Sequence, residues 1–187
     1  MRIIAGELKG KKLLIPLDKS TRPLKDMVRE SIFNILDHSS KVSAKINNSK
    51  VLDLFSGTGS FGIECLSRGA KNVIFFENYI NSLKILKQNI LKLKLENKCN
   101  IYNFSAYDLE NSNFETEIFD IIFLDPPFRY KEIKNLIDQI KKIRIANFNT
   151  LLIIHRNKKS VDKISQFLNV LEEKNYGLSK IFFCKLN

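Results

Sequence analysis

The stretch that decides the fold is VLDLFSGTGSFGIE, residues 51–64. It begins with a short apolar run that suits a buried strand, passes through a turn rich in serine and glycine, and continues with the apolar spacing of a helix. We expect this helix to end at Ser67 and Arg68, with Gly69 as the residue after its C-terminus. A strand, a glycine-rich turn and a helix in this order are typical of the first unit of a doubly wound α/β sheet.

The rest of the chain repeats this alternation of short apolar runs and longer helical patterns. Strands are expected at residues 50–55, 72–77, 100–104, 119–124 and 150–155, and a last strand within 176–184 forms half of an antiparallel edge pair. Apolar stripes predict helices near residues 83–93, 133–140 and 161–171. The predicted fold class is α/β: a doubly wound, mostly parallel, seven-stranded Rossmann-like sheet with helices on both faces.

The first 49 residues follow a different pattern. Two short segments, 2–6 and 11–15, predict a β-hairpin, and residues 24–36 predict a helix. The core face of this helix is expected to hold Leu24, Val28, Ile32, Ile35 and Leu36. Its outward face is expected to hold Arg22, Asp26, Arg29 and Phe33. We therefore expect an N-terminal basic extension over residues 1–49 and a main domain over residues 50–187.

The charge of the chain favours a polyanionic partner. Its 187 residues include 31 Lys and Arg against 20 Asp and Glu, a formal net charge of +11. The richness in Lys, Asn and Ile has an alternative source, because A/T-rich coding alone produces it. The placement of charge is more informative, since residues 1–29 hold eight basic and three acidic side chains. This excess predicts a basic arm that contacts phosphates.

Other features of the sequence restrict the class of protein. No apolar run approaches the ~18 residues of a membrane helix, and the N-terminus lacks the apolar core of a signal peptide. Cys65, Cys99 and Cys184 show no metal-binding or redox spacing, so we expect reduced core thiols. His38 and His155 are expected to be structural. These features indicate a bacterial cytoplasmic protein, a monomer, with no metal site.

The glycine-rich turn predicts a nucleotide-like ligand. Its glycines 57, 59 and 62 form the pattern GxGxxG, and Glu77 ends the next strand about twenty residues on, where a carboxylate holds ribose hydroxyls. A dinucleotide and S-adenosylmethionine both remain possible. Asp53 favours the second, because a carboxylate beside the turn repels a pyrophosphate and attracts an ammonium or sulfonium. The alternatives are that Asp53 only ties down the turn and that Glu77 is a surface acid.

The segment FLDPPF, residues 123–128, ends the fourth expected strand. Pro126 and Pro127 fix two φ angles and remove two N–H donors, which leaves a stiff turn rich in acceptors. Asp125 and free carbonyl groups there accept hydrogen bonds from an amino group, and Phe128 offers a face on which a flat ring stacks. The predicted target is therefore the exocyclic NH₂ of a planar ring, positioned for methyl transfer.

Four motifs together carry a family resemblance. They are RIIAGxxKGxxLxxP at residues 2–16, RPxxDxVRExxFNxL at 22–36, LDLFSGTGSFGIECLSRGA at 52–70 and DPPF at 125–128. The chain resembles the RsmD family of 16S rRNA (guanine-N2)-methyltransferases, within the class I S-adenosylmethionine-dependent methyltransferases. The resemblance implies a substrate guanine in the head of the small ribosomal subunit, modified at N2 in 16S rRNA, either in the 30S subunit or in an assembly intermediate.

The chain departs from the family pattern at several positions. Leu24 and Met27 stand where relatives often have Thr and Arg, and Asn78 stands where Lys or Asp is usual. His155 and Arg156 occupy positions at which relatives commonly carry acids.

The motifs and the resemblance assign candidate residues to three roles. The expected catalytic residues are Asp125, Pro126, Pro127 and Phe128. The expected cofactor-binding residues are Asp53, Phe55, Gly57, Gly59, Glu77, Asn78, Ser105, Ala106 and Asp125, with either Ser105 or Asp108 facing the adenine. The expected RNA-binding residues are Arg2, Lys9, Lys11, Lys12, Arg22 and Arg29. For Arg29 the alternative is a surface salt bridge with Asp26 and no further role.

Three other functions compete with this prediction. A DNA adenine methyltransferase also uses an acid–Pro–Pro–aromatic turn, but such enzymes usually carry a separate target-recognition domain. A non-catalytic RNA-binding module needs neither the glycine turn nor DPPF. A nicotinamide-dependent oxidoreductase would need a catalytic Tyr/Lys or His set that the sequence does not show.

Overall fold

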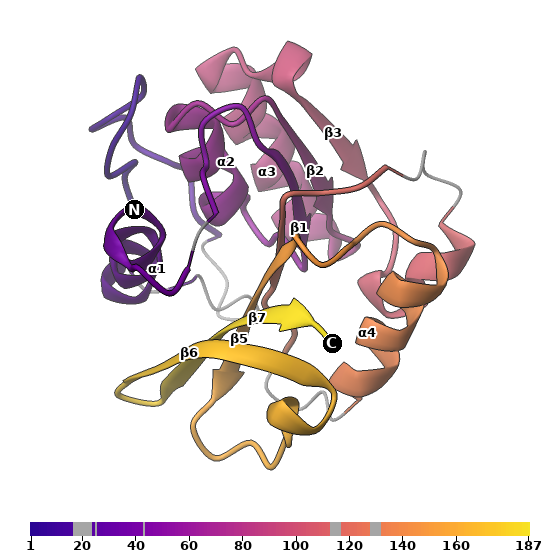
Figure 1. Ribbon diagram of the computed structural model, residues 1–187. Helices are drawn as coiled ribbons and strands as arrows, with labels where there is room; N and C mark the ends of the chain where they lie inside the picture. Colours follow the sequence, from indigo (N-terminus) through magenta and orange to yellow (C-terminus); the bar gives the residue numbers. More distant parts are fainter. Residues whose placement is uncertain (17–23, 25, 43, 113–116, 128–131) are drawn as a thin grey trace.

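The computed structural model describes residues 1–16, 24, 26–42, 44–112, 117–127 and 132–187. At its centre is a seven-stranded sheet with the order β3-β2-β1-β4-β5-β7-β6 (Figure 1). The strands are β1 (Lys50–Leu54), β2 (Asn72–Phe76), β3 (Cys99–Tyr102), β4 (Ile121–Leu124), β5 (Leu151–Asn157), β6 (Leu168–Tyr176) and β7 (Ser179–Leu186). The strands β1 to β5 pair in parallel, and β7 pairs antiparallel with β5 and β6. The predicted α/β class is confirmed.

Helices cover both faces of the sheet and bury each central strand on both sides. The α-helices are α1 (Asp26–His38), α2 (Ser60–Ser67), α3 (Ile80–Leu93) and α4 (Ile133–Lys142); short 3₁₀ turns are η1 (Glu96–Lys98), η2 (Ala106–Asn111) and η3 (Ile164–Gln166). Alternate strand residues, such as Val51 and Phe123, pack under α1, α2 and α3. The residues between them, such as Leu52 and Leu124, pack with α4, η2 and η3 (Figure 1).

The helix expected near residues 161–171 does not form, and this prediction is wrong. The structure has only the single turn η3 there, followed by β6, the edge strand that pairs with β7. Leu168 and Val170 pack in one core cluster and Leu171 in the other, which is the alternation of a strand, and the pairing with β7 shifts register between Val170 and Glu172. Leu168 and Leu171 of the expected helical stripe therefore lie on opposite faces of the sheet, so their three-residue spacing does not mark one face of a helix.

The expected N-terminal β-hairpin is reduced to one antiparallel bridge between Arg2 and Lys12. The chain reverses direction between Ile3 and Leu13, and this segment is called the N-terminal reversal below. Both residues are buried in the core cluster that α1 and α2 share. Instead of pairing in a hairpin, the backbone N–H groups of Ile4 and Ala5 donate to the carboxylate of Glu64 in α2, at 2.8 and 2.9 Å. The start of the chain is therefore packed against the main domain.

The buried face of α1 is wider than predicted. Arg29 and Phe33, expected on the outward face, are both 0% exposed, so that expectation is wrong. Phe33 stacks on Phe61 with ring centroids 5.2 Å apart, because the helix lies against α2. Arg29 donates to the carbonyl of Arg2 at 2.5 Å and to Asp26 at 3.0 Å. The salt bridge between Arg29 and Asp26 therefore forms, but the Arg29 side chain is buried. Burial lowers the pKa of its guanidinium.

Within the described ranges, no helix has the length and apolar content that crossing a bilayer requires.

Candidate active site at the carboxyl edge of the sheet

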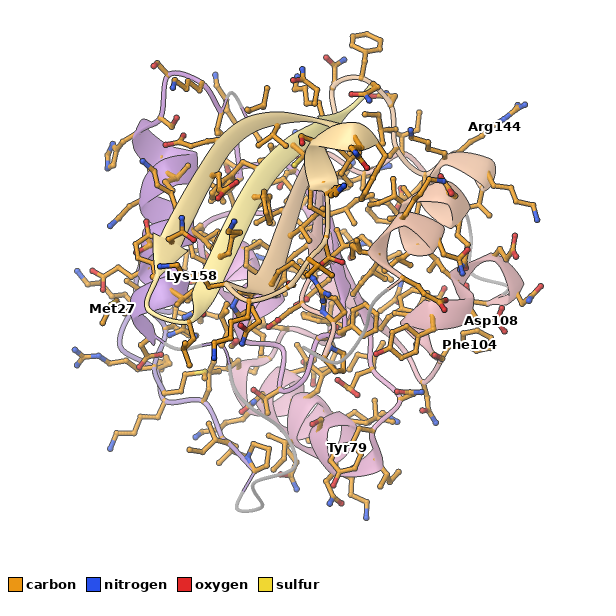
Figure 2. All side chains as sticks on the ribbon, turned by 90° about the horizontal axis from the view of Figure 1, so that it is seen from below. Met27, Tyr79, Phe104, Asp108, Arg144 and Lys158 are labelled. Atoms are coloured by element: carbon orange, nitrogen blue, oxygen red, sulfur yellow. The ribbon has the colours of Figure 1, made fainter. Side chains whose placement is uncertain are left out.

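The candidate site lies where the strand order reverses. The chain passes from β1 outward to β2 and β3 on one side, and β4 and β5 lie on the other side of β1. In open α/β sheets, ligands bind beyond the carboxyl ends of the strands at such a switch point. Figure 2 looks onto this edge, with Tyr79 after β2, Phe104 after β3 and Lys158 after β5 around it. The glycine turn follows β1, and Asp125 follows β4. These are the two neighbouring strands at which the strand order reverses.

The glycine turn is tied to the end of β2. The N–H of Ser56 donates to the carbonyl of Phe76 at 3.0 Å, and its hydroxyl donates to the carbonyl of Asp53 at 2.5 Å. Gly57 has a φ of 56°, and a Cβ added there meets no described atom within 4 Å. Gly62 differs, because a Cβ would lie 2.3 Å from the ring of Phe75. Gly57 therefore leaves open space beside the turn, whereas Gly62 allows α2 to pack closely on β2.

Asp53 is 1% exposed and lies beneath the turn. Its Oδ2 accepts the N–H of Gly62 at 3.0 Å, which ties down the start of α2. Its Oδ1 is buried and has no hydrogen-bond partner among the described residues. Burial, and then the charges of Asp125 and Glu77, raise the pKa of Asp53 well above its ordinary value. Asp53 therefore anchors the turn through Oδ2, while its Oδ1 is an acceptor without a described partner. The carboxylates of Asp53, Glu77 and Asp125 share this site.

Glu77 is buried and joins the end of β2 to the glycine turn, so it is not a surface acid. Its two oxygens accept the N–H of Gly57 and the N–H of Tyr79, each at 2.7 Å. Burial raises its pKa, and these backbone bonds oppose the shift. A carboxylate has about four lone-pair sites, so acceptor capacity remains for hydroxyl groups of a ligand.

The segment after β3 borders the other side of the turn. Ser105 precedes η2, and its hydroxyl accepts the N–H of Tyr107 at 3.3 Å. Ala106 is buried, while Asn78 and Asp108 are exposed, and Asp108 accepts from Asn111 at 2.6 Å. The ring of Tyr107 lies 4.9 Å from that of Phe55, which has a left-handed φ of 63°. Two aromatic rings in contact with each other therefore lie beside the glycine turn.

Asp125 stands directly after β4, with its N–H 3.4 Å from the carbonyl of Leu54. Its Oδ1 lies 2.7 Å from Nδ1 of His155. Pro126 is buried and Pro127 is exposed, so the turn leads from the core to the surface. Phe128 lies outside the described residues.

The expected RNA-binding residues fall into three groups. Arg2, Lys9, Lys11 and Lys12 are exposed, as expected. Arg29 is buried and has no outward surface, and Arg22 lies outside the described residues. The reversal at Gly6 packs on Ser67, the last residue of α2, so about 12 Å of helix separates it from the glycine turn. The chain at Gly6 therefore lies at the far end of α2 from the glycine turn.

Two polar contacts of the site were not expected from sequence. Asn89 of α3 accepts the N–H of Leu14 and donates to the carbonyls of Leu14 and Thr58, which connects the N-terminal segment to the glycine turn. His155 contacts Asp125, although it was expected to be structural. An asparagine within an apolar helical stripe, and a histidine where relatives carry acids, were the available signals.

A mixed seven-stranded sheet with a glycine turn after β1, an acid after β2 and Asp-Pro-Pro after β4 defines a methyltransferase of the Rossmann-like class. The chain belongs to the RsmD family: the family described as "Conserved hypothetical protein 95" matches residues 1–185.

Individual relatives agree with this membership. The chain is 32% identical to ribosomal RNA small subunit methyltransferase D of Haemophilus influenzae, over 95% of this chain and 90% of that protein. It is 30% identical to the protein of the same name from Buchnera aphidicola, over 98% of this chain and 89% of that protein. Among solved structures, "Putative methyltransferase yhhF from Escherichia coli" superposes with a TM-score of 0.83 at 26% identity, covering 100% of this chain and 98% of that chain.

Proposed function

We propose that this protein transfers a methyl group from S-adenosylmethionine to the exocyclic N2 of a guanine in 16S rRNA. The observation that carries the proposal is the convergence of Asp53, Glu77 and Asp125 at the switch point, beside the stiff Asp-Pro-Pro turn. Relatives named as small-subunit rRNA methyltransferases support the RNA substrate. The N2 position is inferred from the four sequence motifs and their resemblance to the family.

The site fits a cationic cofactor better than a dinucleotide. Three neighbouring carboxylates raise the free energy of the empty site, and Asp53 retains a buried oxygen without a partner among the described residues. A ligand bearing an ammonium and a sulfonium relieves this repulsion, whereas a pyrophosphate increases it. Glu77 would hold the ribose hydroxyls, and Phe55 with Tyr107 would flank the adenine. Bound S-adenosylmethionine supplies an activated methyl group on its sulfonium sulfur.

The chain's own residues would orient the acceptor amine. The lone pair of a guanine amino group is delocalised into the ring, so the nitrogen is a weak nucleophile. Asp125 and the carbonyl groups of the Pro-Pro turn accept its N–H bonds, which directs the lone pair toward the methyl group. The oriented nitrogen would take the methyl group from the sulfonium and would then give its extra proton to water.

A labelling experiment tests the substrate class. Small subunits from cells that lack this modification are incubated with the protein and methyl-labelled S-adenosylmethionine, beside large subunits and double-stranded DNA. We expect label in 16S rRNA alone. Label in DNA would support adenine N6 methylation instead, and binding of RNA without any transfer would support a non-catalytic module.

A further inference from the structure

His155 lies in β5, between the strand that leads to Asp125 and the strand that begins with Ser179. Its ring spans both neighbours: Nδ1 is 2.7 Å from Oδ1 of Asp125, and Nε2 is 2.9 Å from Oγ of Ser179. The histidine side chain is 7% exposed and the Asp125 side chain 21% exposed. The contact therefore connects the interior of the sheet to the rim of the candidate site.

The chemistry of the carboxylate fixes the direction of the bond to Asp125, and the neutral ring then fixes the direction of the bond to Ser179. An ionised carboxylate only accepts, so Nδ1 of His155 carries the proton that it donates to Asp125. In the neutral ring Nε2 is then an acceptor, and the hydroxyl of Ser179 donates to it. The imidazole is thereby held in one tautomer and one orientation.

We propose that His155 is a positioning residue that fixes the rotation of the Asp125 carboxylate for the acceptor amine. The inference rests on the proposed function of Asp125. With Oδ1 held by His155, Oδ2 is the oxygen presented to the N–H of the substrate. The backbone before Pro126 is already restricted, so the side-chain torsions of Asp125 are the freedom that His155 removes.

Three substitutions separate positioning from packing. His155→Asn keeps an amide N–H near the position of Nδ1, His155→Gln keeps one near Nε2, and His155→Leu keeps neither. We expect kcat on small subunits to fall roughly 10- to 100-fold for the Leu and Gln variants, and only a few-fold for Asn. Cofactor Kd and the KM for subunits should stay within about two-fold in all three. Equal kcat losses in Asn and Leu, or no loss in Leu, would overturn the proposal.

A spectroscopic measurement tests the contact without turnover. The chain has two histidines, and His38 is exposed, so ¹⁵N spectra of the imidazoles contain an internal reference. We expect His155 in the Nδ1–H tautomer in the wild-type protein and a mixture of tautomers in Asp125→Ala. A His155 signal that is the same in the wild-type protein and in Asp125→Ala would refute the contact. A locked tautomer in a wild-type protein that methylates no RNA would refute the proposed function, and the positioning role with it, while leaving the contact intact.

Discussion

At the scale of single residues, Glu77 decides whether the edge of β2 is a cofactor site. Glu77→Ala removes the acceptor for two backbone N–H groups and for the proposed ribose hydroxyls. We expect S-adenosylmethionine affinity to fall by about 1–3 kcal/mol in calorimetry, the value of charge-assisted hydrogen bonds. In Glu77→Ala the N–H of Gly57 also loses its acceptor, which could disorder the turn. Glu77→Gln is the matched control, because its amide oxygen can still accept from a backbone N–H. Unchanged affinity in Glu77→Ala would remove Glu77 from the site.

Asp53 predicts a pH dependence of stability. Burial raises its folded-state pKa well above the ordinary 3.8, so the folded protein binds this proton more tightly than the unfolded chain. The contribution of Asp53 to stability therefore falls as pH rises from 3.8 through the folded-state pKa. Asn at this position does not titrate and still accepts from Gly62 through its amide oxygen.

Thermal unfolding of the cofactor-free protein checks this sign. As the pH rises from below 3.8 toward neutral, the Tm of Asp53→Asn should improve relative to wild type. The same variant should bind S-adenosylmethionine more weakly, because the carboxylate that attracts the cation is gone. A Tm difference that is constant with pH would contradict the buried, titrating carboxylate.

At the scale of elements, the packing of the N-terminal reversal on α2 rests on Gly6. A Cβ at Gly6 would lie 1.8 Å from the carbonyl oxygen of Ser67, whereas a Cβ at Gly10 meets nothing within 4 Å. Both glycines have a φ of 81°, so Gly10→Ala is a control that carries the same backbone strain. We expect Gly6→Ala to cost about 2 kcal/mol or more beyond the control, because the Glu7–Ser67 backbone bond must break.

Urea unfolding of both variants measures this difference, and limited proteolysis locates it. The Gly6→Ala protein should be cut within its first 14 residues, and the Gly10→Ala protein should resist. Equal unfolding free energies would show that the reversal does not pack on α2 in solution.

The elements that sequence predicted are those with a local signal. The strand, glycine turn and helix of residues 51–67 carry apolar period, turn chemistry and a glycine stop together, and all three formed within a residue or two of expectation. The strand β6 could not be predicted, because its pairing with β7 and its irregularity at Leu171 are tertiary features. Arg29 was misplaced because a helix that packs against two surfaces has a buried arc wider than its apolar stripe.

The site was predictable to the same extent. Asp53 lies near the end of a recognisable strand, Glu77 and Asp125 each follow one, and parallel strands bring their carboxyl ends to one edge. The contact of His155 with Asp125 joins residues 30 positions apart across β4 and β5, and that with Ser179 needs the antiparallel partner β7. No local pattern encodes either contact.

At the scale of the whole molecule, we expect the exposed lysines of the N-terminal segment to contact RNA phosphates. Deleting the segment is a poor test, because Ile3 and Leu13 belong to the core and Glu64 would lose its backbone donors. Substituting Lys9, Lys11 and Lys12 by Gln removes the charge and keeps the packing. If all three contact phosphates, the slope of log affinity against log salt should become shallower by about 2.

The control replaces three exposed lysines on the opposite face of the sheet, Lys134, Lys141 and Lys142 of α4. This variant has the same net charge but should keep the wild-type salt slope. Equal slopes in the two variants would show that net charge alone, not the N-terminal segment, governs RNA binding.

The central claim is methyl transfer to a guanine N2 of 16S rRNA, oriented by Asp125. Its most direct test is mass spectrometry of nuclease-digested 16S rRNA from small subunits methylated with labelled S-adenosylmethionine, by wild type and by Asp125→Ala. We expect N2-methylguanosine at one position with wild type, and none with Asp125→Ala although cofactor affinity changes only a few-fold. Label on an adenine, label spread over many positions, or full transfer by Asp125→Ala would contradict it.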